Sequence, residues 1–169
     1  MDIAGFCQTL DRLLKGRDLR GEGLEGAIKA ICLALGVSAG EVALFLADER
    51  GESLGFLWPR ELRNSGTIPL SSKESLAART FRDGSGRVNN RFSATRHASI
   101  FEAFPLQEQA CKALPIQKII SVPLVASERT LGVLQICRKA VDVTEAGPDF
   151  SREELKGVAH IARTLARHL

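Results

Sequence analysis

Positive charge is concentrated in one polar stretch of the chain. Between positions 79 and 97 the single acidic residue is Asp83, whereas arginine occurs five times. A guanidinium group offers a planar fork of donors that fits a carboxylate or a phosphate. If these side chains converge, the segment could hold a small anion; the alternative is a solvated loop surface whose arginines pair with acids elsewhere. The arginines are Arg79, Arg82, Arg87, Arg91 and Arg96.

Other side chains could complete such a binding site. Asn89, Asn90 and His97 supply hydrogen-bonding groups, and the rings of Trp58 and Phe92 supply flat apolar area. Each also has a plainer explanation, because large rings mostly fill cores and a single histidine mostly makes a surface contact. The candidate ligand-binding residues are Trp58, Arg79, Asn89, Asn90, Arg91, Phe92, Arg96 and His97.

No pattern in the sequence indicates catalysis, a metal site or a cofactor. There is no G-x-S-x-G turn, and serine, histidine and aspartate do not occur in the order of a hydrolytic triad. The cysteines form no C-x-x-C pair and have no clustered histidines, so neither a zinc site nor a disulfide framework is expected. We expect no enzymatic activity. The cysteines are Cys7, Cys32, Cys111 and Cys137.

The composition predicts one globular domain. The chain has 169 residues, of which 44% are apolar and 25% are charged, and this length suits a single core. A net charge of +3 is too small to indicate binding to nucleic acid or to a membrane surface. No apolar run reaches the roughly 20 residues that a spanning helix needs. We expect a cytoplasmic protein.

Helices are predicted at both ends of the chain. Apolar residues recur every three or four positions over residues 3–14 and 24–35, and Gly36 can end the second helix in a left-handed conformation. A capping box at 151–154 predicts a last helix that runs to the C-terminus. A similar box at 71–74 predicts a short helix that ends near residue 83.

Strands are predicted between these helices. Residues 41–47 and 53–58 are apolar runs on either side of a turn, and residues 118–126 and 130–138 form a second, clearer pair of runs. Residues 87–90 indicate a brief extended piece. The segment from Phe101 to Leu114 is polar with scattered apolar residues, which suggests loose helical turns.

The order of these elements and three motifs resemble the GAF domain family. The motifs are Val122-Pro123-Leu124 in one strand, Gly132-Val133-Leu134-Gln135 in the next, and a helix start at Phe150-Ser151-Arg152-Glu153-Glu154-Leu155. The resemblance implies an α+β fold with a six-stranded antiparallel sheet, terminal helices on one face, and a cavity under loops and short helices on the other. It covers about residues 22–169 and leaves 1–21 as an additional helix that could serve dimerisation.

Several branches of the family can be compared with this sequence. The motif of the cyclic-nucleotide-binding members is broken here, because the matching positions read Arg138-Lys139, Phe150 and Glu154-Leu155. No cysteine stands beside His97 to bind a bilin. Cys111 lies near the region where free methionine-(R)-sulfoxide reductases of this family carry reactive cysteines, but it has no neighbouring acid and no partner cysteine on the short helix.

The resemblance and the residues together predict a sensory domain. We expect a non-enzymatic regulator that binds a small ligand, an anion if the arginines hold it, and acts in signal transduction as a homodimer or through a separate signalling protein. The apolar stripes of the first and last helices are the expected dimer contact. Two alternatives are a ligand-free interaction module and a sulfoxide reductase that uses Cys111.

Overall fold

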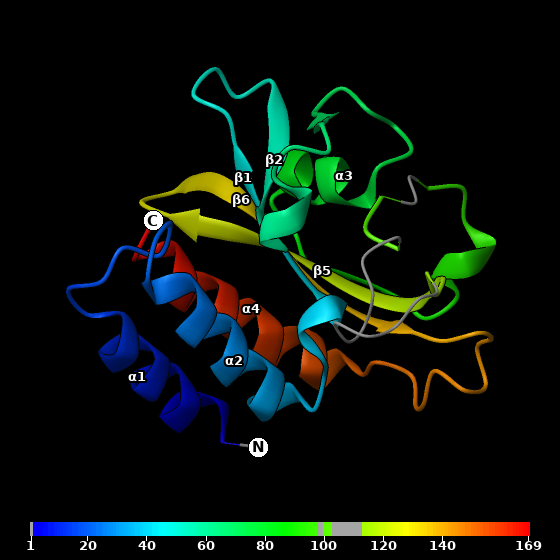
Figure 1. Cartoon of the computed structure of the whole chain (residues 1–169), viewed down its shortest axis with the longest axis horizontal. Coiled ribbons are helices and arrows are strands. Elements are labelled where there is room, and N and C mark those ends of the chain that lie inside the picture. The colour runs from blue at the N-terminus through cyan, green and yellow to red at the C-terminus, as the bar shows by residue number, and fades with distance from the viewer. Residues whose placement is uncertain (1, 98–99, 103–112) are drawn as a thin grey trace.

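The fold is a six-stranded antiparallel sheet with helices on both faces. The computed structural model describes residues 2–97, 100–102 and 113–169. The strands follow the order β3-β2-β1-β6-β5-β4, so β1 and β6 occupy the middle of the sheet and β5 lies between β6 and the edge strand β4. Helices α1, α2 and α4 cover one face, whereas α3 and the loops around it lie over the other (Figure 1).

The strands match the apolar runs of the sequence, with one addition. The long strands β5 and β6 pair antiparallel along their length, and β1 pairs with both β6 and β2. The addition is β3, three residues that pair with β2 at the sheet edge. The strands are β1 (Val42–Ala47), β2 (Ser53–Trp58), β3 (Thr67–Pro69), β4 (Arg87–Asn89), β5 (Ile116–Ala126) and β6 (Arg129–Lys139).

The helices begin and end where local sequence signals allow. Gly36 ends α2 in a left-handed conformation with φ 65°, and Gly84 ends α3 in the same way with φ 60°. The capping box at Ser151 and Glu154 is present at the start of α4. The helices are α1 (Ile3–Leu14), α2 (Gly23–Leu35), α3 (Leu76–Asp83) and α4 (Arg152–Ala166), with 3₁₀ turns at Ala39–Glu41, Arg60–Leu62 and Phe92–Ala94.

The start of α3 differs from its prediction. The predicted capping box at 71–74 does not cap the helix; instead Ser75 is the cap, and its hydroxyl accepts a hydrogen bond from the amide of Ala78. Ser72 supports this turn by accepting from the amide of Ser75. Ser71, Ser72 and Ser75 each offer an oxygen, so the sequence alone does not select one of them. Most of the predicted helical turns at 101–114 fall outside the described residues.

The sheet separates two apolar cores. The helix-side core lies between the sheet and α1, α2 and α4, and it includes Leu10, Leu14, Ile31, Leu44, Ile120, Leu134, Val158, Ile161 and Leu165. The loop-side core lies between the sheet, α3 and the loops, and it includes Phe45, Leu54, Phe56, Ala77, Phe92, Phe101, Ile119, Val133 and Cys137. Most apolar residues of α4, and Leu10 and Leu14 of α1, are therefore used within the chain.

Gly132 allows β1 and β6 to approach each other closely. A Cβ atom at this position would lie 2.0 Å from the backbone oxygen of Phe45 on the neighbouring strand. Any larger residue would push the two strands apart. This contact explains why the apolar run of β6 contains a glycine.

In the described part of the chain, no helix is long and apolar enough to cross a membrane.

Candidate functional site

A small cavity lies between the loop-side face of the sheet and the elements above it. Its volume is about 50 Å³. The lining comes from the sheet, the start of α3 and the segment after the 3₁₀ turn at Phe92–Ala94, which are distant in sequence. The lining residues include Phe45, Phe56, Ile68, Ser75, Leu76, Ala77, Phe92, His97, Ile100, Phe101, Ile116, Ile119 and Gln135.

Aromatic rings give the cavity its apolar character. The ring centroids of Phe45 and Phe56 are 4.5 Å apart, and those of Phe56 and Phe101 are 6.4 Å apart. Phe92 packs against the imidazole of His97 with centroids 4.2 Å apart. These tilted pairs are typical of rings that pack through their faces and edges. The cavity is therefore suited to apolar or planar groups.

One buried amide supplies polarity at the base of the cavity. Gln135 is 6% exposed, and its Nε2 donates to the hydroxyl of Ser121 at 3.2 Å. The hydroxyl of Thr80 also donates to Ser121, at 2.8 Å. Within the residues that the structure describes, the carbonyl oxygen Oε1 of Gln135 has no hydrogen-bond donor. Sequence reasoning missed this residue as a site residue, although a glutamine inside an apolar strand is a usable signal.

His97 closes one side of the cavity through two hydrogen bonds. Its Nε2 lies 3.0 Å from Oε1 of Glu102, and its Nδ1 lies 2.6 Å from the backbone oxygen of Thr95. Both partners are acceptors, so the ring satisfies both contacts only when both nitrogens carry protons. Glu102 also accepts the backbone amide of Ile116 at 2.8 Å. Glu102 thereby attaches His97 to the start of β5.

A buried lysine and a buried thiol lie beside the cavity. Lys139 is 5% exposed, and its Nζ donates to the backbone oxygen of Phe101 at 2.6 Å and lies 4.2 Å from the centroid of that ring. Burial lowers the pKa of Lys139, because desolvation disfavours the ammonium form. Burial also raises the pKa of the Cys137 thiol well above its usual range. Cys137 is therefore a protonated core residue and not a nucleophile.

The predicted arginine cluster does not converge over this cavity. Arg79 is exposed and donates to the backbone oxygen of Lys73 at 3.1 Å, and Arg96 makes an exposed ion pair with Glu74 at 3.5 Å. Arg82 donates to the backbone oxygens of Leu70 and Ser72, and Arg87 pairs with Asp83. Of the five arginines, four thus bind backbone carbonyls or nearby acids.

The two asparagines hold loops together. Asn90 donates to the backbone oxygen of Phe150 at 3.0 Å and accepts the amide of Phe150 at 2.9 Å, which fixes the chain just before α4. Asn89 accepts the amide of Arg91 at 2.9 Å and donates to Thr95 at 3.1 Å. Asn90 and Arg91 line a separate surface hollow that also contains Val143 and Asp149. The side chains of both asparagines thus form hydrogen bonds with other groups of this chain.

Trp58 lies on the opposite face of the sheet from Phe92 and His97. It packs against the helix-side core, and its indole Nε1 donates to the backbone oxygen of Ala39 at 3.1 Å. The pairing of β1 with β2 contains an irregularity between Leu44 and Phe45, which turns Trp58 away from the face that carries Phe56. The structure thus does not bring Trp58 together with Phe92 and His97. Of the predicted residues, Phe92 and His97 line the cavity.

The residues that match the cyclic-nucleotide motif have a structural role here. Arg138 pairs with Glu154 at 3.1 Å, and its guanidinium lies 4.4 Å from the centroid of the Phe150 ring. These contacts attach β6 to the start of α4 on the helix side of the sheet. Lys139, the next residue, points to the loop side. The motif positions are thus divided between the two faces.

Neither a metal site nor a thiol is present in the cavity as described. Among residues 2–97, 100–102 and 113–169, no group of three or more histidine, cysteine or acidic side chains could hold a metal ion. The described cysteines lie elsewhere: Cys7 lies on α1, Cys32 lies on α2 and Cys137 is enclosed in the loop-side core. Cys111 lies outside the described residues.

Comparisons with known proteins agree with this architecture. A search of curated proteins found no match. The chain is similar to the GAF domain of a phosphoenolpyruvate-protein phosphotransferase from Coxiella burnetii, with 14% identity, a TM-score of 0.72, and coverage of 99% of this chain and 92% of the other. The corresponding domain from Acinetobacter gives 14% identity, a TM-score of 0.71 and the same coverage.

A third similar structure is an enzyme. It is the free methionine-R-sulfoxide reductase from Neisseria meningitidis, with 17% identity, a TM-score of 0.68, and coverage of 98% of this chain and 87% of the other. Identities this low show a shared fold and do not by themselves show a shared activity. The family model for the GAF domain matches residues 21–169. The six-stranded antiparallel sheet, its two differently covered faces and this match together show that the chain belongs to the GAF domain family.

Proposed function

We propose that this chain is a sensory domain whose loop-side cavity binds a small, largely apolar ligand. The observation that carries the proposal is the lining, in which Phe45, Phe56, Phe92 and Phe101 surround space above the amide of Gln135. Ligand sites in proteins combine apolar walls with a few placed polar groups. GAF domains are sensory and regulatory modules, which fits a binding role without catalysis.

The lining favours a planar ligand with a hydrogen-bond donor over an anion. Gln135 Oε1 can accept a hydrogen bond, and the phenyl rings can pack against a flat molecule. The arginines that suggested an anion have other partners or lie outside the cavity. Such a ligand would therefore be recognised by its flat shape and by one hydrogen bond to the side-chain amide of Gln135.

Ligand binding would require the cavity to open. A volume of about 50 Å³ corresponds to little more than one water molecule, whereas ligand pockets usually enclose several hundred Å³. The contacts of His97 and Glu102 hold the closed arrangement. A ligand that binds the open arrangement more tightly would shift the population toward it. That difference between two loop arrangements is the proposed signal.

The proposed sensor acts as a homodimer. The predicted contact through the first and last helices is less favoured, since most apolar residues of α4, and Leu10 and Leu14 of α1, are buried within the chain. The outer face of α2 is a better candidate, because Leu33 is 78% exposed there. Exposed apolar surface of this kind often marks a contact between proteins.

Thermal unfolding with matched probes tests the ligand proposal. Indole, which is planar and carries one donor, should raise the melting temperature in a saturable way, and benzoate should raise it less. Gln135→Leu should reduce the indole effect, whereas Arg79→Ala should leave it unchanged. A benzoate effect that Arg79→Ala abolishes would instead support the anion clamp. Absence of any effect from either probe would argue for a ligand-free interaction module.

The reductase alternative has its own test. Its fold-level support is the similarity to the sulfoxide reductase, and its required thiol would be Cys111. Purified protein should be assayed with free methionine-(R)-sulfoxide and a dithiol reductant. Turnover that Cys111→Ser abolishes would establish the enzyme and overturn the non-enzymatic proposal. Absence of turnover would remove the alternative.

A further inference from the structure

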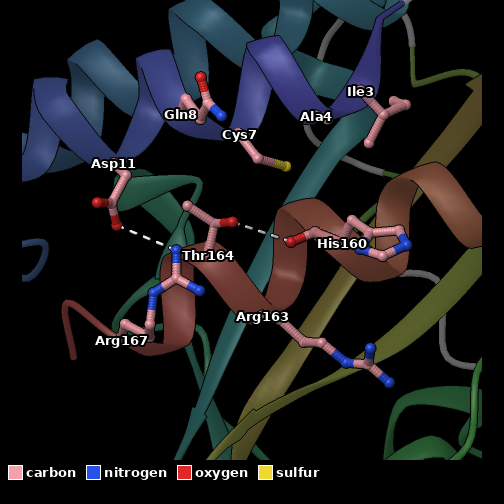
Figure 2. Close-up of a pocket in the computed structure, with 9 residues that line it drawn as sticks. All are labelled: Ile3, Ala4, Cys7, Gln8, Asp11, His160, Arg163, Thr164 and Arg167. Carbon is pink, nitrogen blue, oxygen red and sulfur yellow. Dashed lines mark hydrogen bonds and ion pairs between the residues drawn. The ribbon is translucent and has the colours of Figure 1, made fainter.

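Another hollow lies between α1 and α4, on the opposite side of the sheet from the loop-side cavity. Its volume is about 440 Å³, and it is open to solvent. Figure 2 shows the two helices facing each other across it, with Cys7 and Thr164 between them. We call it the α1–α4 groove. Its lining residues are Ile3, Ala4, Cys7, Gln8 and Asp11 from α1, and His160, Arg163, Thr164 and Arg167 from α4.

The groove exists because the two helices are held at their ends and carry small side chains between. At one end α4 has Gly157, where a Cβ atom would lie 2.8 Å from Cδ1 of Ile3. At the other end Asp11 accepts from Arg167 at 3.1 Å and from His168 at 3.0 Å. Between these points Ala4 and Cys7 are too small to fill the space. The small side chains of Ala4 and Cys7 therefore leave the groove unfilled, and the contacts at its two ends keep the helices at this separation.

The rim of the groove carries a stripe of basic side chains in which Lys156 pairs with Glu153 and Arg167 pairs with Asp11, whereas Arg163 has no partner among the described residues. The exposed positions of α4 recur every three or four residues and place one basic stripe along the helix. Within the part of the chain that the structure describes, the side chains of His160 and Arg163 have no hydrogen bond or ion pair. In Figure 2 the side chain of Arg163 extends away from α1. The stripe consists of Arg152, Lys156, His160, Arg163 and Arg167.

The acidic groups near the stripe are already satisfied. Hydrogen bonds from His168 and Arg167 lower the pKa of Asp11, so this carboxylate is ionised and paired. Glu153 pairs with Lys156 at 2.9 Å. The groove therefore combines an apolar wall from α1 with a basic stripe from α4, in which the guanidinium of Arg163 has no ion-pair partner among the described residues.

From this combination we infer that the α1–α4 groove binds an acidic amphipathic helix of a partner protein. Apolar residues of such a helix, spaced by three and four, would contact Ile3, Ala4 and Cys7, and its flanking carboxylates would reach Arg163. A second copy of this chain fits less well. In a two-fold contact the same patch meets itself, so the basic stripe would face a basic stripe.

A peptide titration tests this inference independently of the ligand-binding cavity. The probe is a labelled helical peptide of about four turns, with leucines spaced by three and four residues and glutamates beside them. The matched control peptide has lysine at every glutamate. Fluorescence anisotropy should show saturable binding of the acidic peptide alone, weaker in about 300 mM than in about 50 mM salt.

Variants locate the binding site. Arg163→Glu should weaken acidic-peptide binding about tenfold, and Ala4→Trp, which fills the groove, should abolish it. Arg50→Glu makes the same charge change on the β1–β2 turn, far from α1 in Figure 1, and should have no effect. Circular dichroism and thermal unfolding check that each variant folds.

Three outcomes would overturn the inference. Absence of acidic-peptide binding, or equal loss of binding for Arg163→Glu and Arg50→Glu, would show that the groove does not select an acidic helix. Self-association of the unmodified chain that Ala4→Trp abolishes would assign the groove to a second copy. Light scattering on the same variants separates this last outcome from peptide binding.

Discussion

Oε1 of Glu102 lies 3.0 Å from Nε2 of His97 and 2.8 Å from the backbone nitrogen of Ile116. One carboxylate oxygen therefore joins the segment after the 3₁₀ turn at Phe92–Ala94 to the first residue of β5. Both contacts border the loop-side cavity, which His97 and Ile116 help to line. The cavity is thus closed by hydrogen bonds as well as by apolar packing.

Glu102→Ala should loosen this closure. The amide of Ile116 would lose its acceptor, and the expected cost is about 1–3 kcal/mol of unfolding free energy. Hydrogen exchange of the Ile116 amide, followed by NMR, should become faster. The increase should exceed the increase that the loss of global stability alone would cause. Glu102→Gln is the control, because its carbonyl oxygen can still accept. Equal exchange rates in both variants would show that Glu102 does not hold β5.

Gly132→Ala should disrupt the sheet. The new methyl group would meet the backbone oxygen of Phe45, 2.0 Å from the ideal Cβ position, so β1 and β6 must separate. We expect a loss of more than about 2 kcal/mol of unfolding free energy in urea titrations. Gly55→Ala is a matched control in the same sheet, since no atom lies within 4 Å of its added Cβ. Similar losses for both substitutions would contradict this explanation.

The arrangement of the main elements could be predicted from the sequence because burial dictates it. The runs that became β5 and β6 are apolar on both faces, as expected for central strands covered on both sides. The helical stripes at 3–14 and 24–35 and the capping box at Ser151 each depend on neighbouring residues alone. Local signals of this kind are readable without tertiary contacts.

The composition of the cavity could be predicted only in part, because it depends on long-range contacts. Phe92 and His97 were selected from the sequence, whereas Gln135 was missed. Simple alternation along β2 would place Trp58 on the same face as Phe56, and the irregular pairing beside Phe45 reverses this. Arginine side chains are long and can donate to many different carbonyl oxygens, so the partner of Arg79 could not be inferred from spacing.

Lys139 should give the stability of the protein a distinct pH dependence. In the unfolded chain the pKa of Lys139 has its ordinary value of 10.5, and burial lowers it in the folded state. At a pH between the folded-state pKa and 10.5, the unfolded chain therefore binds more protons than the folded chain. The free energy of unfolding contributed by this group therefore rises as the pH increases toward 10.5. Lys139→Met removes the titrating group. Urea titrations from about pH 7 to about pH 10 should show the unmodified chain gaining stability relative to Lys139→Met. A constant difference across this range would show that the ammonium group is not destabilised by its burial.

Leu33 should be the most sensitive position for self-association. It is 78% exposed on α2, and the half-buried Ala30, one turn before it, is small enough to let a second helix approach. Leu33→Glu should weaken a dimer at least about tenfold without loss of stability, because the side chain contributes little to the fold. Light scattering over a concentration series measures this change. Val141→Glu is the control, since Val141 is also apolar and 69% exposed but lies after β6. A dimer that resists Leu33→Glu, or a monomer at every concentration of the unmodified chain, would exclude the outer face of α2 as the contact.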